Sequence, residues 1–204
     1  MAQPDFSPSA ERNKQPILET LQTFLPAQGT ALEIASGTGQ HVVWLAQQMP
    51  LWTWQPTEVH PGALYNIEVR ATEADLANVN IALPLDVCKT PWQLEDTPFD
   101  LILCINMLHI APWEACSALM RGAATHLAPG GRLVTYGPYF ETGVAPTQSN
   151  LDFDQSLRTH DASFGIRQLA DVQEQATLAG LHLQARHALP ANNLLLVWGH
   201  APAH

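Results

Sequence analysis

The sequence predicts an α/β fold in which helices cover a doubly wound, mainly parallel sheet. Three observations lead to this expectation. Short apolar runs typical of strands alternate along the chain with segments of helical periodicity. A glycine turn, Ser36-Gly37-Thr38-Gly39, separates the first of these runs from the helical pattern that follows it. The last two strand-like runs are joined by a short loop typical of a hairpin, so the final strand is expected to be antiparallel.

The first half of the chain contains three expected strands and three expected helices. Pro16 favours a helix start because its missing N–H falls in the first turn. The strand at 31–35 is apolar throughout, as a strand buried on both faces is. Residues 52–59 alternate and carry aromatics, which indicates the second strand, and Pro84 makes the third strand, 81–87, irregular. The helices are expected at 16–25, 42–49 and 61–71.

The second half begins with the clearest buried strand, FDLILCIN at 99–106. A helix is expected at 113–127 because apolar residues recur there on one face. Pro129-Gly130-Gly131 then indicates a turn before a fifth strand at 132–136.

Residues 137–165 look loop-like, and we expect an insertion at about 138–167 that acts as a lid. A helix at 168–179 is stopped by Gly180. The two closing strands are expected at 181–188 and 194–198.

Length and composition fit one domain, residues 11–204, after a flexible lead at 1–10 that is rich in Pro, Ser and Gln. The net charge of −10, with no basic stripe, argues against a nucleic-acid partner. No apolar run approaches about 18 residues, so we expect a soluble, cytoplasmic protein with no membrane partner.

Cysteines and histidines give no sign of a disulfide or a metal site. Cys88, Cys104 and Cys116 are odd in number and show no CxxC spacing. The first two lie in strand-like runs, so we expect buried free thiols in a reducing compartment. The nine histidines lack paired-ligand motifs, and His200 and His204 lie at the chain end, so no metal is expected.

The spacing of the glycine turn argues against two phosphate-binding motifs. A dinucleotide fingerprint needs a small residue three places after its second glycine. That place holds Val42 when counted from Gly39, and Gln40 when counted from Gly37. A P-loop would need Gly-Lys followed by Ser or Thr, which the turn lacks.

Polar side chains recur at the ends of the expected strands, where such sheets bind ligands. Glu58 lies nineteen residues after Gly39, a position suited to holding ribose hydroxyls. Asp86 and Asn106 end the next two strands along the chain. Because these strand ends meet at one edge of the sheet, we expect the three side chains to surround one ligand site.

Residues from about 30 to 137 resemble the class I S-adenosylmethionine-dependent methyltransferases. The resemblance rests on the turn with its preceding acid, LDV at 85–87, FDLILCINMLHI at 99–110 and HLAPGGRLVTYGP at 126–138. The whole chain also resembles a small uncharacterised methyltransferase-like family found in bacteria and animals. That likeness is carried by ERNKQPIL at 11–18, EIASGTGQH at 33–41 and GIR at 165–167.

The resemblance implies a Rossmann-like sheet of seven strands with an antiparallel last strand, and S-adenosylmethionine as the cofactor. In it Glu58 would hold the ribose, Asp86 would accept from the adenine amino group, and Asn106 would face the methionine portion. The family usually has glycine where Ala35 stands, and the extra methyl group would tighten the turn. The cofactor-binding residues implied are Glu33, Ala35, Ser36, Gly37, Gly39, Glu58, Asp86, Val87, Asn106 and Met107.

Candidates for the acceptor side of the site come from loops at the same edge. Methyl transfer needs alignment above all, and a base only where the acceptor must lose a proton. Packing or a solvated surface is an alternative role for each candidate. Arg12, Asn13 and Lys14 could meet the lid, which would favour an anionic or polar small acceptor. The candidate side chains are His109 as a base, Tyr136, Tyr139 and Phe140 after the fifth strand, and Asn150 and Arg158 in the lid.

The leading hypothesis is therefore a methyltransferase that acts on a small molecule or a protein side chain. The alternative is a non-catalytic binding or scaffold module that kept the fold. A nicotinamide-dependent oxidoreductase is disfavoured by the glycine spacing. The sequence leaves the methyl acceptor and the oligomeric state open.

Overall fold

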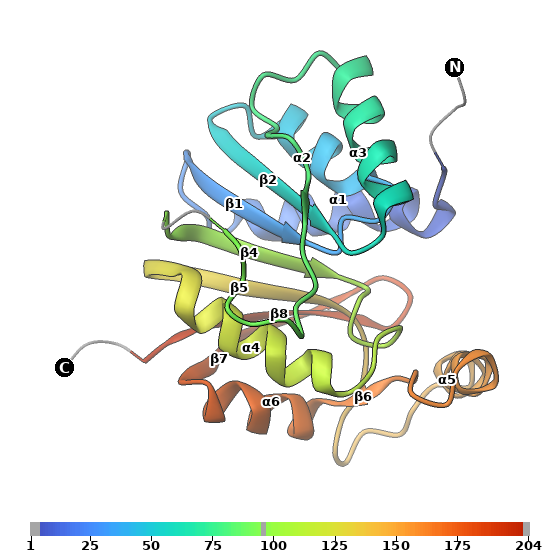
Figure 1. Cartoon of the computed structure of the whole chain (residues 1–204). Coiled ribbons are helices and arrows are strands. Elements are labelled where there is room, and N and C mark those ends of the chain that lie inside the picture. The colour runs from blue at the N-terminus through green and yellow to red at the C-terminus, as the bar shows by residue number, and fades with distance from the viewer. Residues whose placement is uncertain (1–4, 95–96, 202–204) are drawn as a thin grey trace.

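The computed structural model describes residues 5–94 and 97–201, which contain a sheet of eight strands. The strands are β1 (Gly29–Ile34), β2 (Trp52–Glu58), β3 (Leu83–Pro84), β4 (Phe99–Ile105), β5 (Leu127–Phe140), β6 (Arg167–Gln168), β7 (Leu181–Leu189) and β8 (Asn193–His200). The helices are α1 (Pro8–Gln22), α2 (Gln40–Gln48), α3 (Pro61–Glu73), α4 (Glu114–His126), α5 (Gln148–His160) and α6 (Leu169–Leu178). Figure 1 shows helices on both sides of the twisted sheet.

The strand order in the sheet is β3-β2-β1-β4-β5-β8-β7, and β6 pairs with the end of β5. Strands β1 to β6 pair with one another in parallel, whereas β8 is antiparallel to both β5 and β7. The predicted doubly wound sheet with an antiparallel last strand is therefore confirmed. The order reverses between β1 and β4, which is the place where open α/β sheets bind ligands.

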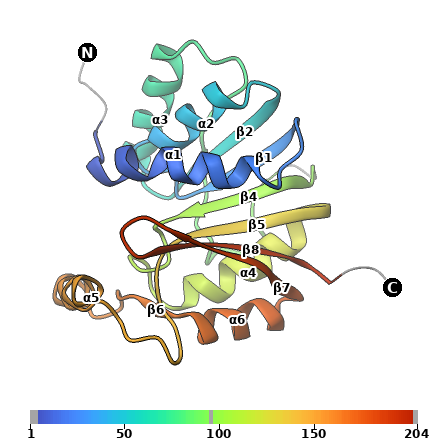
Figure 2. The same cartoon turned by 180° about the vertical axis from the view of Figure 1, so that it is seen from behind.

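Two apolar cores lie against the two faces of the sheet. Helices α1, α2 and α3 pack on one face, and α4 and α6 pack on the other (Figures 1 and 2). Along β4, Leu101 and Leu103 enter the first core, while Ile102 and Cys104 enter the second. Cover on both faces explains why this strand is apolar throughout. In the part of the chain that is described, no helix combines the length and apolar character needed to span a membrane.

Helix α1 begins at Pro8, earlier than the predicted start at Pro16. Ser7 caps the helix, and its Oγ accepts from the Ala10 N–H at 3.3 Å. Pro8 fits the first turn, where its nitrogen needs no intrahelical partner, and Pro16 is accommodated inside the helix. The end of the predicted flexible lead is thus helical, while residues 1–4 lie outside the described part of the chain.

Strand β5 is continuous, so the predicted turn before a short fifth strand is wrong. Phe99 of β4 pairs with Leu127, and Leu101 pairs with Arg132. The residues of β5 between these pairs, including the predicted turn at 129–131, bulge out of the ladder without ending the strand.

The segment predicted as loop, 137–165, contains helix α5 and the last residues of β5. Thr147 caps α5 by accepting from the Asn150 N–H at 3.4 Å. Leu157 is the buried residue of this helix, which explains why no apolar periodicity marked it. Figure 1 shows α5 at one end of the molecule, apart from the helices that cover the sheet.

The third strand is shorter than the predicted 81–87, because only Leu83 and Pro84 pair with β2. Asp86 therefore follows the strand and does not end it. Cys88 lies in the same segment and is exposed, against the expectation of a buried thiol, whereas Cys104 is buried as expected.

Candidate functional site

The carboxyl ends of β1, β2 and β4 border a cavity of about 840 Å³, called here the larger cavity. Glu58, Asp86 and Asn106 surround one hollow as expected, although Asp86 lies two residues after the end of β3. Glu33 and Gly39 do not line the cavity, and Glu33 is buried. The predicted cofactor residues that line it are Ala35, Ser36, Gly37, Glu58, Asp86, Val87, Asn106 and Met107.

The turn after β1 depends on left-handed backbone at alternate residues. Ala35 and Gly37 have φ of 55° and Gly39 has φ of 75°. A Cβ at Gly39 would lie 3.0 Å from the Ile67 Cα, so glycine there lets α3 pack against the start of α2. A Cβ at Gly37 would meet only the Ala35 carbonyl oxygen, at 4.0 Å. Because Gly37 lines the larger cavity, the absence of a side chain there leaves more room for a ligand. Ala35 adopts the same conformation despite its Cβ, at a cost of about 1–2 kcal/mol.

Glu58 joins this turn to the end of β2. Its Oε2 accepts from the Gly37 N–H at 2.9 Å, and its Oε1 accepts from the N–H groups of Val59 at 2.7 Å and His60 at 3.3 Å. A carboxylate offers about four acceptor positions, so these three bonds leave capacity for a ligand hydroxyl. The side chain is only 5% exposed, which fixes it in place at the cavity wall.

Glu33 lies beneath the turn and carries an unsatisfied atom. It is 1% exposed, and its Oε2 has no hydrogen-bond partner among the described residues. Burial raises the pKa of Glu33 to about 8, a hydrogen bond from Ser36 lowers it in part, and the charge of Glu58 raises it further. The carboxyl is therefore mostly protonated at neutral pH, and a positive charge nearby would favour its ionisation.

The larger cavity has an acidic wall. Glu58, Asp86 and Asp161 line it, and the described lining residues include no Lys or Arg. Asp86 is held in place because its Oδ1 accepts from the Cys88 N–H at 3.0 Å. This wall suits a ligand with a positive charge and hydroxyl groups, and it opposes a ligand with several phosphates.

A second cavity of about 590 Å³, called here the smaller cavity, adjoins the first. The two share Ser9, Asn106 and Ile110 as lining residues. Asn106 follows β4 directly, has φ of 60°, and donates its N–H to the Tyr136 carbonyl at 2.8 Å. The arrangement allows two ligands to meet beside the Asn106 side chain.

His109 lines the smaller cavity and is 6% exposed. Burial lowers its pKa to about 4, and the nearby charge of Arg167 lowers it further. The imidazole is therefore neutral at pH 7 and can accept a proton. The ring of Phe153, from α5, meets it edge-on with 5.5 Å between the ring centroids.

Arg167 fastens the loop that carries His109. Its Nε donates to the Leu108 carbonyl at 2.9 Å, and its Nη2 donates to the carbonyls of Ala111 at 2.5 Å and Ser163 at 2.9 Å. The Gly165 N–H also donates to the His109 carbonyl at 3.0 Å. The sequence placed Arg167 only within the lid and gave it no role. The GIR motif at 165–167 was the one signal that pointed to it.

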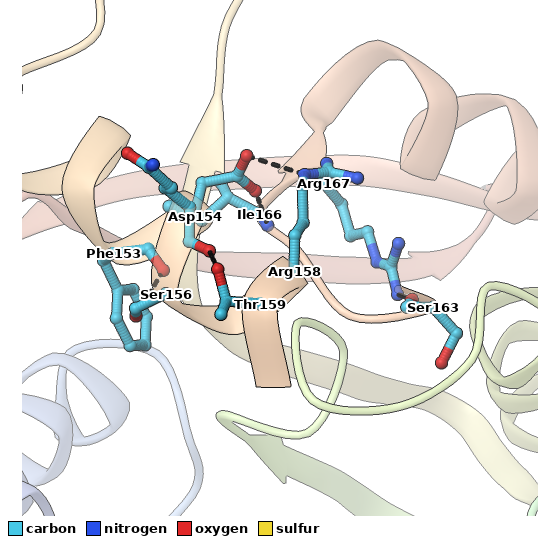
Figure 3. Close-up of polar contacts among 9 residues, drawn as sticks. Phe153, Asp154, Ser156, Arg158, Thr159, Ser163, Ile166 and Arg167 are labelled. Carbon is cyan, nitrogen blue, oxygen red and sulfur yellow. Dashed lines mark hydrogen bonds and ion pairs between the residues drawn. The ribbon is translucent and has the colours of Figure 1, made fainter. Parts of the chain in front are cut away.

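Helix α5 is joined to the same segment through Asp154. Its Oδ1 accepts from the Ile166 N–H at 2.7 Å, and its Oδ2 accepts from Arg158 Nε at 2.8 Å (Figure 3). Phe153, the residue before Asp154, contacts His109. Residues 153–167 and the loop after β4 therefore form one connected unit.

Of the side chains predicted for the acceptor side, His109 and Tyr136 line the smaller cavity, whereas Tyr139, Phe140, Asn150 and Arg158 line neither of the two cavities. Tyr139 is buried, and its hydroxyl donates to Thr135 Oγ1 at 3.0 Å in the core beside α4. Asn150 contacts the Asn192 carbonyl at 3.5 Å, and Arg158 is paired with Asp154.

Comparison with known protein families gives one match, to the family described as "Protein of unknown function (DUF938)", over residues 4–200. The chain belongs to this family. The matched residues include those that line both cavities, helix α5 and the hairpin of β7 and β8. The site described above therefore lies within the region that defines the family.

Several solved structures share the fold. An O-methyltransferase family protein from Burkholderia thailandensis superposes with a TM-score of 0.79 at 17% identity, over 96% of this chain and 58% of that one. The S-adenosylmethionine-dependent methyltransferase SibL, in its apo form, gives a TM-score of 0.75 at 20% identity, over 94% and 55%. CalO1, a methyltransferase of calicheamicin biosynthesis in its SAH-bound form, gives 0.72 at 14% identity, over 96% and 61%. This family member thus spans little more than half the length of these enzymes, and the likeness shows the fold alone.

Proposed function

We propose that the protein is an S-adenosylmethionine-dependent methyltransferase. The observation that carries the proposal is the larger cavity, where Gly37, Glu58, Asp86 and Asn106 surround one acidic hollow at the switch point of the sheet. A nucleoside with a sulfonium charge has the hydroxyls and the positive charge that such a wall favours. The shared fold with solved methyltransferases adds support at the level of architecture.

The chain's own residues fit the parts of this ligand. Glu58 has acceptor capacity for the ribose hydroxyls, and Asp86 with Val87 offers a carboxylate and an apolar contact for the adenine. Asn106 and Met107 lie where the methionine portion would extend toward the smaller cavity.

The same wall argues against a dinucleotide. Two phosphates would need cationic side chains or a row of free backbone amides at a helix start. The described wall of the larger cavity has no Lys or Arg, and the Gly37 amide is already bonded to Glu58. This geometry agrees with the spacing argument from the sequence.

Held beside Glu58, Asp86 and Asn106, S-adenosylmethionine would supply a methyl group to an acceptor oxygen, and its sulfur would keep the electron pair of the carbon–sulfur bond. The protein's task is to align the acceptor beside Asn106, since orientation can supply about 7–11 kcal/mol. Neutral His109 is placed to take the acceptor's hydroxyl proton. Phe153 of α5 and His109 of the loop after β4 line the smaller cavity and contact each other.

Calorimetric titration with S-adenosylmethionine and S-adenosylhomocysteine tests the proposal. We expect binding of both, weakened about tenfold or more in Glu58→Ala, because the variant loses a ribose acceptor with a charge-assisted bond. Glu174→Ala, an exposed acid on α6, is the matched control and should bind as the native protein does. Absence of binding to either ligand would contradict the proposal. Asp86→Asn, which changes the cavity without touching the turn, tests the same point if Glu58→Ala does not fold.

A binding or scaffold module is the second candidate, and Ala35 is the observation in its favour, since its Cβ adds bulk to the cavity wall. Incubation with methyl-labelled S-adenosylmethionine and a metabolite extract separates the two. Transfer of label supports the enzyme. Ligand that binds but is never turned over supports the module.

A further inference from the structure

We propose that the smaller cavity binds a small organic acid as the methyl acceptor, with its carboxylate at Arg12 and its reacting group beside Asn106. This inference rests on the proposed function and names the substrate class of that site. It comes from the contrast in charge between two cavities that share a wall.

The charge of the smaller cavity is opposite to that of the larger one. Arg12 lines the smaller cavity, and no Asp or Glu is among its described lining residues. The chain as a whole has 19 Asp and Glu against 9 Lys and Arg. A cavity wall with an arginine and no described acid therefore differs from the acidic average of the chain. Two ligands of opposite charge side by side would each be matched to their own wall.

Arg12 has no partner within the described residues. Its neighbour Lys14 is paired with Glu11 at 2.6 Å and lies over the Trp44 ring, and Arg186 is paired with Glu141. None of the hydrogen bonds or ion pairs of residues 5–94 and 97–201 involves the Arg12 guanidinium. An exposed guanidinium can bind a carboxylate through two parallel hydrogen bonds.

Neutral polar side chains line the smaller cavity together with Arg12. Asn13 Oδ1 accepts from His41 Nε2 at 2.7 Å, which orients the Asn13 amide to donate, and this amide also bonds the Tyr136 hydroxyl. His41 is neutral because burial lowers its pKa to about 4. The Tyr136 hydroxyl lies between Asn13 and Asn193. These donors would supplement Arg12 around an anionic group.

Apolar side chains line another part of the wall. They include Pro16, Pro138, Phe153 and Pro190, and the Phe153 ring can pack on a planar organic body. The volume of about 590 Å³ is that of a small-molecule site. An acceptor that lies along this wall would have its anionic end at α1 and its other end between Asn106 and His109.

Matched probe pairs test the proposal: hydroxybenzoic, hydroxyphenylacetic and hydroxycinnamic acids, each against its neutral methyl ester. Each is titrated into the full chain in the presence of S-adenosylhomocysteine. We expect at least one acid to bind about tenfold more tightly than its ester, and Arg12→Gln to remove that preference. Arg121→Gln, an exposed arginine on α4, should keep it. Equal affinity for every acid and its ester, or an unchanged preference in Arg12→Gln, would overturn the proposal.

A second experiment tests whether the carboxylate belongs to a free organic acid or to a protein. It uses methyl-labelled S-adenosylmethionine in a cell extract. Labelled product that is anionic at pH 7 and passes a small-pore filter supports a free organic acid, and label retained on protein overturns it. Failure of this inference is separable from failure of the proposed function. S-adenosylhomocysteine that binds while no acid is preferred overturns only the acceptor class. An acid preference that depends on Arg12 in a protein that never binds S-adenosylhomocysteine overturns only the methyltransferase.

Discussion

The Gly37 N–H donates to Glu58 Oε2 at 2.9 Å, so the turn after β1 and the end of β2 are held together by one charge-assisted bond. The same carboxylate accepts from the two amides that follow it in the chain. This bond fixes the distance between the main chain of the turn and the acid proposed to hold the ribose. The geometry of the larger cavity therefore depends on the turn as much as on the strands.

Alanine at the two turn glycines is expected to separate binding from stability. Gly37→Ala and Gly39→Ala should each cost about 1–2 kcal/mol of unfolding free energy, because both residues have left-handed backbone. Gly39→Ala should cost more, since its Cβ would press on Ile67 at 3.0 Å. Gly37→Ala should weaken S-adenosylhomocysteine binding more, because Gly37 lines the cavity. Denaturant unfolding and calorimetry measure both, and a Gly37→Ala variant with native affinity would contradict the assignment.

Glu33→Gln is expected to stabilise the protein increasingly as pH rises. The pKa of Glu33 is raised to about 8, whereas an unfolded Glu ionises near 4.5. Between these values the folded state binds more protons, so native stability falls as pH increases from 4.5 to 8. The variant lacks this loss and should be more stable by on the order of 3 kcal/mol at pH 7. The measurement is the difference in unfolding free energy between variant and native protein across pH 4.5–8. Glu174→Gln is the exposed control, and a difference that does not change with pH would contradict the prediction.

The strand ends of the site could be predicted because they follow from apolar patterns. A strand that is buried on both faces shows itself as an uninterrupted apolar run, and the polar residue that ends the run must lie at the sheet edge. Asn106 was placed correctly on this ground, and Glu58 was placed correctly from the alternation and aromatics of residues 52–59. The contact between Gly37 and Glu58 is a finding of the structure, and it results from the parallel pairing of β1 with β2.

The acceptor side could not be predicted in the same way. Strand β5 continues beyond 136, so Tyr136 and Pro138 face the smaller cavity while Tyr139, on the opposite face, enters the core. A strand that ends at 136 gives no basis for this alternation. Arg12 reaches the cavity only because α1 begins at Pro8, and that start depends on a cap that apolar periodicity does not reveal.

Arg167→Lys is expected to loosen the loop that carries His109 without removing the positive charge. Arg167 donates to three carbonyls, and a lysine ammonium on a flexible stem does not reproduce that planar fork. We expect a loss of about 2 kcal/mol in unfolding free energy, since bonds from charged donors are removed. The pKa of His109, followed by its ring proton resonance, should rise toward its usual value as its burial decreases. Arg158→Lys is the control because it alters an exposed ion pair. It should change the unfolding free energy by less than about 1 kcal/mol and should leave the pKa of His109 nearly unchanged.

His109→Gln is expected to slow methyl transfer to a hydroxyl acceptor by about 10²–10⁴-fold while S-adenosylhomocysteine affinity is unchanged.

The stability of the His109→Gln variant should also be less sensitive to acid than that of the native protein. The pKa of His109 is lowered to about 4 by burial, while an unfolded histidine takes up a proton near pH 6.5. The unfolded state therefore binds more protons between these values, and native stability is lost as pH falls from 6.5 to 4, by about 3 kcal/mol for this one group. Acid unfolding followed by circular dichroism should show a smaller loss over that range in His109→Gln than in the native protein. His182→Gln, an exposed residue of β7, is the control. A variant that keeps the native acid profile would show that His109 is not buried in the neutral form, and one that keeps the native rate would show that the base lies elsewhere.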